Sequence, residues 1–382
     1  MAHVRRVPRK AQTGRARFAY EVRYRDPDHR ERVKTFARKL DAVNFAASIE
    51  TDKQRDEYID PKLGRVTFGE WSAKWLASKS IQPKTRNGYE DVMRNLVLPA
   101  FADQQLAKVR ALDVERFFAD LRESGVSVSR LRHAKTLLHQ IFEAAVRNSY
   151  IVRSPVLGVR LPKSQPREMN VLTAEQVDAI GYNLPERYRA LVYLLAYGGL
   201  RWGEAAALRR GRCNLLRGRI EVTEAVSEVN GVLHYGSTKT HQARSVALPG
   251  FLRKLLAEHL TAFTENDPDA FVFTTDNGTP LRNGNFRRRV WVSALDKAEL
   301  PRTVRIHDLR HTCASLLISK GASIKAVQNH LGHASAAMTL DVYGHMLPDE
   351  QDRIAAELDE AFRAARESSA AGSHEHVGDG PD

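Results

Sequence analysis

The side chains with the clearest chemical potential lie in the last third of the sequence. His307 and Arg310 are three positions apart in the run His-Asp-Leu-Arg-His, and His333 and Tyr343 complete a set that spans 37 positions. On a helix, a spacing of three places two side chains on one face. An arginine and a histidine on one face can bind a phosphodiester, and a nearby tyrosine can act as a nucleophile. The pattern therefore indicates covalent, metal-independent cleavage of a phosphodiester in nucleic acid.

Two more cations come earlier in the chain. Residues 195–208 read as a helix, a Gly-Gly break and a second helix, and Arg201 lies at the break with Glu204 three positions on. Lys239 lies between two short β-like runs, so we expect it at a hairpin tip. Attack on phosphorus adds negative charge, and an arginine fork aimed at the non-bridging oxygens can stabilise it.

Taken together, these motifs resemble the tyrosine recombinase family, and specifically phage or prophage integrases of the actinobacterial, mycobacteriophage-like type. In that family the order is Arg, Lys, His-x-x-Arg, His or Trp, and Tyr. The same order is found here in Arg201, Lys239, His307, Arg310, His333 and Tyr343. The chain departs from the usual pattern at Gly198, where Thr is common, and over 208–217, which lacks the usual Trp and acidic residues.

The resemblance implies a role for each of these residues. Tyr343 is the expected nucleophile and Lys239 the proton donor to the leaving 5′ oxygen. His333 would hydrogen-bond the scissile phosphate, and Glu204 would buttress the arginine and the histidine. His307 is within sequence reach to accept the tyrosine proton. His311 lies nearly a turn beyond His307 and is expected to pack or cap.

The implied reaction is site-specific recombination. A 3′-phosphotyrosyl bond keeps the energy of the broken strand, so a 5′-hydroxyl of another duplex can reseal it without ATP or any other cofactor. Strand exchange through a Holliday junction implies a homotetramer on double-stranded DNA with core-type and arm-type attachment sites. A host DNA-bending factor and an excisionase are possible further partners, and a bacterial cytoplasm, at the nucleoid, is the expected location.

Composition agrees with a polyanionic partner. The 382 residues carry a net charge of +13, and residues 1–40 hold 13 Lys and Arg against 4 Asp and Glu. Residues 349–382 are acidic, with 3 Arg against 10 Asp and Glu. A basic body favours nucleic acid, and an acidic end can compete for the same surface. Two cysteines are too few for a disulfide framework, and we expect neither a membrane span nor a secretory signal.

The predicted fold is multidomain, mainly α with small β-sheets. We expect an arm-type DNA-binding module of β-sheet and helix over 1–64 and a helical, SAM-like core-binding domain over 65–160. A linker over 161–170 would lead to a mixed α+β catalytic domain over 171–366. The acidic tail over 367–382 is expected to be disordered.

Local patterns predict the elements of the first two domains. Phe18, Tyr20, Val22 and Tyr24 alternate as in a strand, and a helix is expected over 41–55. Helices are predicted over 86–97, 113–123 and 129–148, and Thr67 and Glu70 form a capping-box pattern. The basic residues expected to contact DNA are Arg15, Arg17, Arg23, Arg25, Lys84, Arg86, Arg130, Arg132 and Lys135. In the alternative interpretation, the aromatic residues face their own helix and the charges are solvated.

Fewer elements of the catalytic domain can be predicted. Thr173 and Gln176 form a second capping-box pattern. Strands are expected near 219–223, 232–235, 244–248 and 271–274, and a final helix over 348–366.

Three other functions fit parts of the pattern. His307 and His311 resemble the two ligands of a zincin-like hydrolase, although Arg310 would bring positive charge close to such a metal, and a chelator would distinguish the two chemistries. A type IB topoisomerase shares the Arg, Lys, Arg, His and Tyr set. A non-catalytic architectural DNA-binding protein would bind specific sites without covalent adducts.

Overall fold

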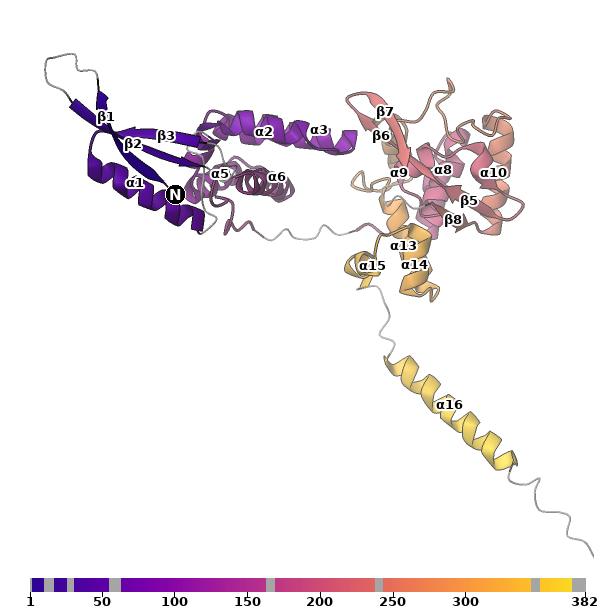
Figure 1. Cartoon of the computed structure of the whole chain (residues 1–382). Helices are drawn as coiled ribbons and strands as arrows, with labels where there is room; N and C mark the ends of the chain where they lie inside the picture. The colour runs from indigo at the N-terminus through magenta and orange to yellow at the C-terminus, as the bar shows by residue number, and fades with distance from the viewer. Residues whose placement is uncertain are drawn as a thin grey trace, which may run out of the picture. The chain divides into compact units, whose positions relative to one another are not determined.

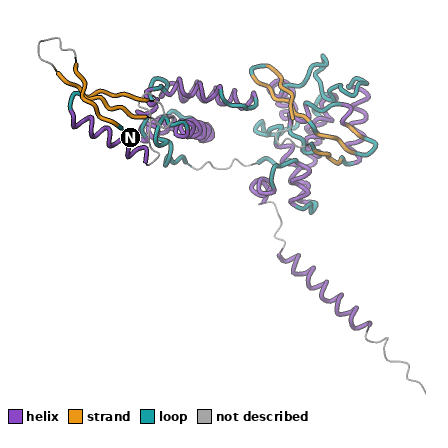
Figure 2. The backbone as a smooth tube through the Cα atoms, viewed as in Figure 1, coloured by secondary structure: helices purple, strands orange, loops and turns teal. Residues whose placement is uncertain are grey.

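The computed structural model describes residues 2–9, 17–25, 31–54, 63–162, 169–237, 243–344 and 351–372. The chain divides into two compact units, Met1–Pro166 and Arg167–Asp382. The boundary falls within the linker predicted over 161–170. Figure 2 shows that helices make up most of both units and that strands form only small sheets.

A three-stranded antiparallel sheet begins the first unit, in the order β1–β2–β3 (Figure 1). Its strands are β1 (His3–Arg9), β2 (Arg17–Arg25) and β3 (Glu31–Phe36), followed by helix α1 (Lys39–Gln54). Val22 and Tyr24 are buried with Ala42 and Ile49 of α1, and Tyr20 and Phe36 pack against them. The predicted strand and helix are confirmed, and Tyr20 and Tyr24 face their own helix as in the alternative interpretation.

The second part of this unit is entirely helical. Its helices are α2 (Phe68–Ala77), α3 (Pro83–Val92), α4 (Leu98–Phe101), α5 (Ala111–Glu123) and α6 (Val128–Arg147). The Thr67–Glu70 capping box is confirmed at the start of α2. A core of Phe68, Trp71, Phe142 and other apolar side chains fills the space between the helices. The predicted helix over 86–97 is confirmed, because α3, a π-helical turn at Met93–Val97 and α4 follow one another without a break.

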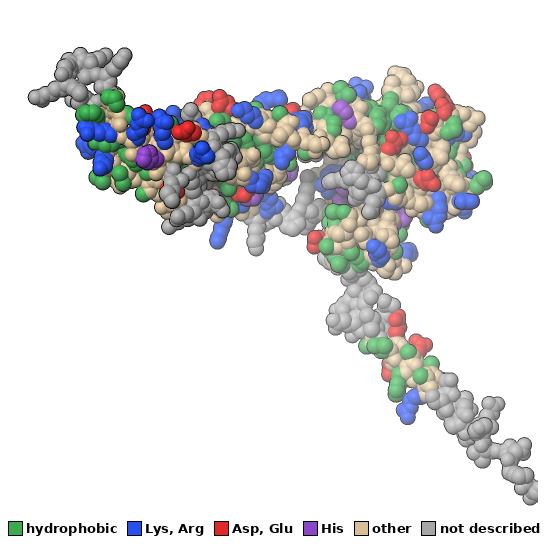
Figure 3. All heavy atoms as spheres, in the orientation of Figure 1, with side chains coloured by type: hydrophobic (Ala, Val, Ile, Leu, Met, Phe, Trp, Pro, Cys, Tyr) green, Lys and Arg blue, Asp and Glu red, His purple; other side chains and the backbone are tan. Residues whose placement is uncertain are grey.

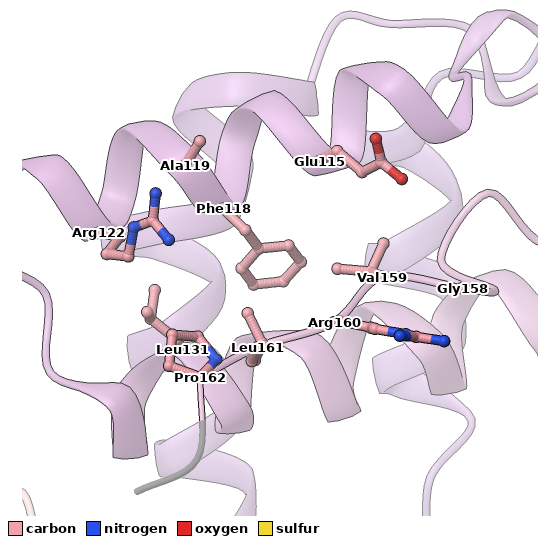
Figure 4. A pocket seen from close by; sticks show the side chains of 10 residues that line it. All are labelled: Glu115, Phe118, Ala119, Arg122, Leu131, Gly158, Val159, Arg160, Leu161 and Pro162. Atoms are coloured by element: carbon pink, nitrogen blue, oxygen red, sulfur yellow. The ribbon is translucent and has the colours of Figure 1, made fainter.

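A cavity of about 320 Å³ lies in this helical part, between α5, α6 and residues 158–162. Figure 4 shows Phe118 and Leu161 near its centre, with Arg122, Glu115 and Arg160 around them. It contains none of the residues predicted to do chemistry.

The second unit alternates helices with short strands. Its helices are α7 (Ala174–Tyr182), α8 (Glu186–Tyr197), α9 (Trp202–Ala206), α10 (Gly250–Phe263), α11 (Asn283–Phe286), α12 (Val292–Lys297), α13 (Asp308–Ser319), α14 (Ile324–Leu331), α15 (Ala336–Tyr343) and α16 (Gln351–Gly372). Its strands are β4 (Cys213–Asn214), β5 (Arg219–Val222), β6 (Glu224–Val229), β7 (Val232–Ser237) and β8 (Arg244–Ala247). The capping box at Thr173 and Gln176 is confirmed.

Helices α8 and α13 pack against each other within the second unit. Helix α8 is apolar on several sides, with Leu191, Leu194 and Leu195 buried. Leu309, in the first turn of α13, is buried in the same core, which anchors the start of α13. This packing fixes the helix that carries the His-x-x-Arg motif.

The strand pairing differs from the predicted hairpin. Strand β7 pairs with β6, whereas β8 pairs with β5. Strands β7 and β8 therefore do not pair with each other, so the described strands on the two sides of Lys239 do not form the expected hairpin. Lys239 itself lies outside the described residues. The strand predicted near 271–274 is also wrong, because Phe271 and Thr274 make only isolated bridges.

The end of the chain is more helical than predicted. Residues 367–372 belong to α16, so the expected disordered tail over 367–382 is wrong for these six; 373–382 lie outside the described residues. Side chains 355–366 of α16 are all exposed. Across the described ranges, none of the helices combines the length and the hydropathy needed to cross a bilayer.

Candidate active site

Two glycines shape the end of α8 and place Arg201. Gly198 caps α8, and Gly199 has φ +65°, a left-handed conformation that favours glycine. A Cβ on Gly199 would also lie 2.9 Å from the Cys313 sulfur and 2.7 Å from Leu331. The predicted break therefore exists because α8 must stop against α13 and α14. Arg201 follows as the N-cap of α9.

A buried carboxylate, Glu204, holds two arginines at this break. Its Oε1 accepts a hydrogen bond from Arg201 Nη1 at 2.9 Å, and its Oε2 accepts one from the Arg201 backbone N–H at 2.8 Å. Arg244 of β8 donates from Nη1 and Nη2 at 3.0 and 2.7 Å. Burial alone would raise the pKa of Glu204, but Arg244 and Arg201 outweigh it and lower the pKa to about 2. Glu204 is thus an anion that orients both guanidinium groups.

Replacing Glu204 with glutamine should destabilise the second unit. Its side chain is 1% exposed, and removing one partner of a buried ion pair costs about 3 to 5 kcal/mol. For a unit of this size that corresponds to a melting temperature lower by about 6 to 20 °C. Calorimetry of the full chain at pH 7 measures it. Glu221→Gln is the matched control, because the Arg212–Glu221 pair is half exposed and should contribute less than about 1 kcal/mol. Equal melting temperatures for the two variants would contradict this role.

The buried Glu204 carboxylate, paired with Arg201 and Arg244, also predicts that stability depends on pH. Glu204 has a folded-state pKa of about 2, below its ordinary value of 4.5. Its contribution is therefore complete above about pH 4.5 and is lost as the pH falls toward 2. Melting temperatures of the wild type should converge with those of Glu204→Gln over this window.

The His-x-x-Arg motif lies at the start of α13, with His307 as the N-cap. Arg310 is only 2% exposed, and its Nη1 donates to the Gly199 carbonyl at 2.6 Å. Within the described residues its Nη2 is buried without a hydrogen-bond partner. Burial, and then the positive charge of Arg201, lower the pKa of Arg310 to about 9. The site thus keeps one buried cationic donor available for an anion.

Asp308 anchors the N-terminus of α13. It is fully buried and accepts hydrogen bonds from the Arg305 backbone N–H at 2.8 Å and from Arg305 Nη2 at 2.7 Å. Asn170 donates to the same carboxylate at 3.3 Å, and the Leu172 N–H donates to the Thr312 hydroxyl at 3.0 Å. The segment that follows the interdomain linker is therefore bonded to the helix that carries His307 and Arg310.

Tyr343 is the last residue of α15 and is 1% exposed. Its phenol oxygen lies 2.7 Å from Nδ1 of His311. Burial raises the pKa of Tyr343 to about 12, against the opposing charge of Arg310. The expectation that His311 only packs or caps is wrong, because it is the hydrogen-bond partner of the predicted nucleophile.

The other two histidines lie on either side of this pair. The His307 ring is 4.9 Å from the His311 ring at 87°, and the His333 ring lies parallel to Tyr343 with centroids 6.3 Å apart. His333 Nδ1 is 2.9 Å from the Thr339 hydroxyl. Desolvation and the surrounding cations lower the pKa of both His307 and His333 to about 4. Both rings are therefore neutral near pH 7.

Gly332 connects the two halves of the site. It ends α14 with φ +68°, and its carbonyl accepts a hydrogen bond from Arg201 Nη2 at 3.0 Å. A Cβ here would lie 2.9 Å from the Arg244 side chain. Glycine at this position lets the Arg244 side chain pack against the backbone beside His333. The second unit therefore brings together Arg201, Glu204, His307, Arg310, His333 and Tyr343, while Lys239 is outside the described residues.

The basic residues of the helical part differ in their exposure and in their hydrogen-bond partners. Lys84 is exposed, and Arg130 and Arg132 are exposed but bonded to Asp91 and the Pro162 carbonyl. Arg86 donates to two main-chain carbonyls at the end of α2, and Lys135 donates to the Val159 carbonyl at 2.6 Å. Arg86 and Lys135 therefore have structural roles that a DNA contact would have to replace.

The sheet of the first unit is basic on its surface. Figure 3 shows Lys and Arg side chains gathered over these strands. Arg23 and Arg25 are exposed on the face opposite α1, and Arg23 pairs with Glu21 at 3.4 Å. Arg6 lies 3.5 Å over the Phe18 ring. Arg15 is outside the described residues, and only the backbone of Arg17 is described.

Sequence reasoning missed Arg244, Asp308 and His311. Asp308 lies within the His-x-x-Arg motif, so its place in the sequence could have indicated a role at the site. Arg244 contacts Glu204 across 40 positions, a pairing that no local spacing encodes. The zincin-like alternative needs a third ligand, and in the part of the chain that the structure describes no group of three or more His, Cys, Asp or Glu is placed to hold a metal.

Two family models match the chain. The "Phage integrase family" model matches residues 170–350, and the "Phage integrase, N-terminal SAM-like domain" model matches 67–122. The prophage phiRv2 integrase of Mycobacterium tuberculosis is 27% identical over 355 residues, covering 89% of this chain and 92% of the relative. The integrase of Mycobacterium phage D29 is 27% identical over 325 residues, covering 80% and 84%.

Solved structures share the fold. The Tn1549 transposon integrase in complex with a circular intermediate DNA superposes with a TM-score of 0.66 at 22% identity, covering 77% of this chain and 99% of that one. A lambda integrase tetramer bound to a Holliday junction gives 0.57 at 20% identity, covering 87% and 93%. The helical part and the second unit thus have the architecture expected from the sequence.

Proposed function

Because this chain belongs to the phage integrase family and is a tyrosine-type site-specific recombinase of mycobacteriophage-like type, we propose that it integrates and excises phage or prophage DNA at attachment sites. The proposed catalytic residues are Arg201, Lys239, His307, Arg310, His333 and Tyr343, with Glu204 in support. The observation that carries the assignment is Arg310, a buried guanidinium beside Tyr343 and three histidines, whose Nη2 has no hydrogen-bond partner among the described residues.

The proposed reaction begins with a scissile phosphate between Arg201 and Arg310. Their charges stabilise the negative charge that builds on phosphorus. Tyr343 attacks, and Lys239 gives a proton to the leaving 5′ oxygen. The 3′-phosphotyrosyl bond is then opened by a 5′-hydroxyl of the second duplex.

We propose the domain roles from charge and family. Residues 1–64 would bind arm-type sites, 65–160 would bind the core site, and 171–366 would cut it. Lys84, Arg130 and Arg132 are the preferred phosphate contacts of the helical part, since they are exposed. Recombination of two duplexes needs four cuts, which supports a homotetramer on DNA, in the bacterial cytoplasm. A host bending factor and an excisionase are further proposed partners.

Formation of the covalent adduct tests the function. A duplex with a nick near the crossover point loses its short 5′ fragment after cleavage, which traps the adduct. We expect wild-type protein to become linked to the 3′ end of the cut strand of its attachment site, and to no unrelated duplex. Relaxation of supercoiled DNA without a specific site would favour the topoisomerase instead.

Removing residues 1–62 should abolish specific binding to arm-type sites and leave cleavage of the core site. The truncated protein starts at Leu63 because Gly64, in the turn Leu63–Arg65, is buried against the helical part. Affinity for the arm site should fall to the non-specific level, at least about 10³-fold lower. Titration at two salt concentrations measures it, since lost phosphate contacts also reduce the salt dependence. Unchanged arm-site affinity would contradict this domain role.

A further inference from the structure

Tyr343 is hydrogen-bonded to His311, a residue that is not among the six proposed catalytic residues. The two side chains come from α15 and α13, 32 positions apart, and their heavy atoms are 2.7 Å apart. The phenol oxygen is enclosed, because Tyr343 is 1% exposed. A proton leaving this oxygen must pass to a group already inside the site.

The neighbouring histidines are less suited to accept that proton. No hydrogen bond joins His307 to Tyr343 in the described part of the chain, and its ring lies beyond that of His311. His333 lies parallel to the tyrosine ring at 5°, and its Nδ1 is bonded to Thr339. Within the described residues, no hydrogen bond joins His333 to the phenol oxygen. His311 alone of these three contacts the reacting atom.

The surroundings of His311 suit a neutral base. Desolvation lowers the pKa of His311, while Asp308 opposes this and Arg305 and Arg310 add to it. The ring is therefore uncharged near pH 7 and can accept at Nδ1 when its own proton is on Nε2. Once protonated, it would be stabilised by the negative charge of Asp308 and of the bound phosphate.

We propose that His311, rather than His307, is the general base that takes the proton of Tyr343 during cleavage. The proposal rests on the proposed function and assigns the Nε2–H tautomer to His311. As the Tyr343 oxygen bonds to phosphorus, its proton moves to His311 Nδ1. The bond from phosphorus to the 5′ oxygen breaks, and that oxygen takes its proton from the general acid. In resealing, the oxygen of the incoming 5′-hydroxyl bonds to phosphorus and its proton returns to the group that acted as general acid. The Tyr343 oxygen leaves phosphorus and regains the proton from His311. His307 is then free to contact the phosphate.

The test compares His311→Asn, His311→Ala and His307→Asn in the full chain. The asparagine side-chain oxygen can take the place of Nδ1 as a hydrogen-bond acceptor, but it is not a base. Single-turnover cleavage is measured on the attachment-site duplex that the wild type links covalently. A second duplex carries sulfur at the bridging 5′ position, so that its leaving group needs no proton and activation of the nucleophile limits the rate.

On the sulfur substrate we expect His311→Asn to be slower than wild type by about 10² to 10⁴ at pH 7. The wild-type rate should be nearly constant from pH 7 to 9. The rate of His311→Asn should rise about tenfold per pH unit as hydroxide replaces the base, because Tyr343 titrates above this range. His307→Asn should be slower but keep the flat profile.

Three results would overturn the proposal. These are a His311→Asn rate equal to wild type, a flat profile for His311→Asn, or transfer of the pH dependence to His307→Asn. The melting temperature and DNA affinity of each variant show whether it has lost its fold. A wild-type cleavage rate in His311→Asn together with a reduced rate in His311→Ala would show that the hydrogen bond is purely structural. If the wild type forms no adduct on any site, the proposed function fails instead.

Discussion

Tyr343→Phe is expected to bind attachment-site DNA like the wild type and to form no covalent adduct. The substitution removes the proposed nucleophilic oxygen and nothing else of the ring. Tyr343 packs with Cys313, Ile318 and Leu331, and phenylalanine keeps these contacts. The lost hydrogen bond to His311 should cost only about 1 kcal/mol of stability. Denaturing gels after incubation with nicked duplex measure the adduct, which should fall below detection.

Tyr193→Phe provides the matched control. Tyr193 also donates its phenol hydrogen bond to one side chain, Asp178, but it lies on α8 and contacts none of the proposed catalytic residues in the described part of the chain. Adduct formation by this variant should equal that of the wild type. Persistent adducts with Tyr343→Phe would show that another residue is the nucleophile, and equal loss in both variants would indicate a general effect on folding.

Lys239→Ala and Arg310→Ala should both block cleavage of ordinary DNA, but only the first should be rescued by bridging sulfur. Loss of a proton donor costs about 10² to 10⁴ in rate. Loss of a donor to the developing charge costs about 10² to 10³. Because a thiolate leaves without a proton, the sulfur substrate removes the need for Lys239. It leaves the need for Arg310 unchanged, since charge still builds on the phosphate.

Folding controls matter more for Arg310 than for Lys239. Arg310 is 2% exposed and bonded to the Gly199 carbonyl, so alanine leaves a cavity and an unpaired carbonyl. Arg310→Lys keeps the charge but loses the fork, and should cleave slowly with a near-normal melting temperature. If the sulfur substrate rescued both Lys239→Ala and Arg310→Ala, or neither of them, Lys239 would not be the general acid.

The sequence by itself determined the elements that depend on neighbouring residues. The capping boxes at Thr67 and Thr173 formed as predicted, because a cap bonds groups within one turn. The Gly-Gly break placed Arg201 at a helix start for the same reason. The order of six motif residues identified the family, since each is defined by its type and its place along the chain.

Tertiary structure alone decided which groups face each other across the site. Arg244 reaches Glu204 across 40 positions. Tyr343 meets His311 rather than His307 because α15 packs on α14, and α14 in turn packs on α13. The pairing of β8 with β5, and not with β7, likewise overturned the predicted hairpin. Such contacts follow from the packing of whole helices and strands, and local spacing constrains which residues share a face but not which partner that face meets.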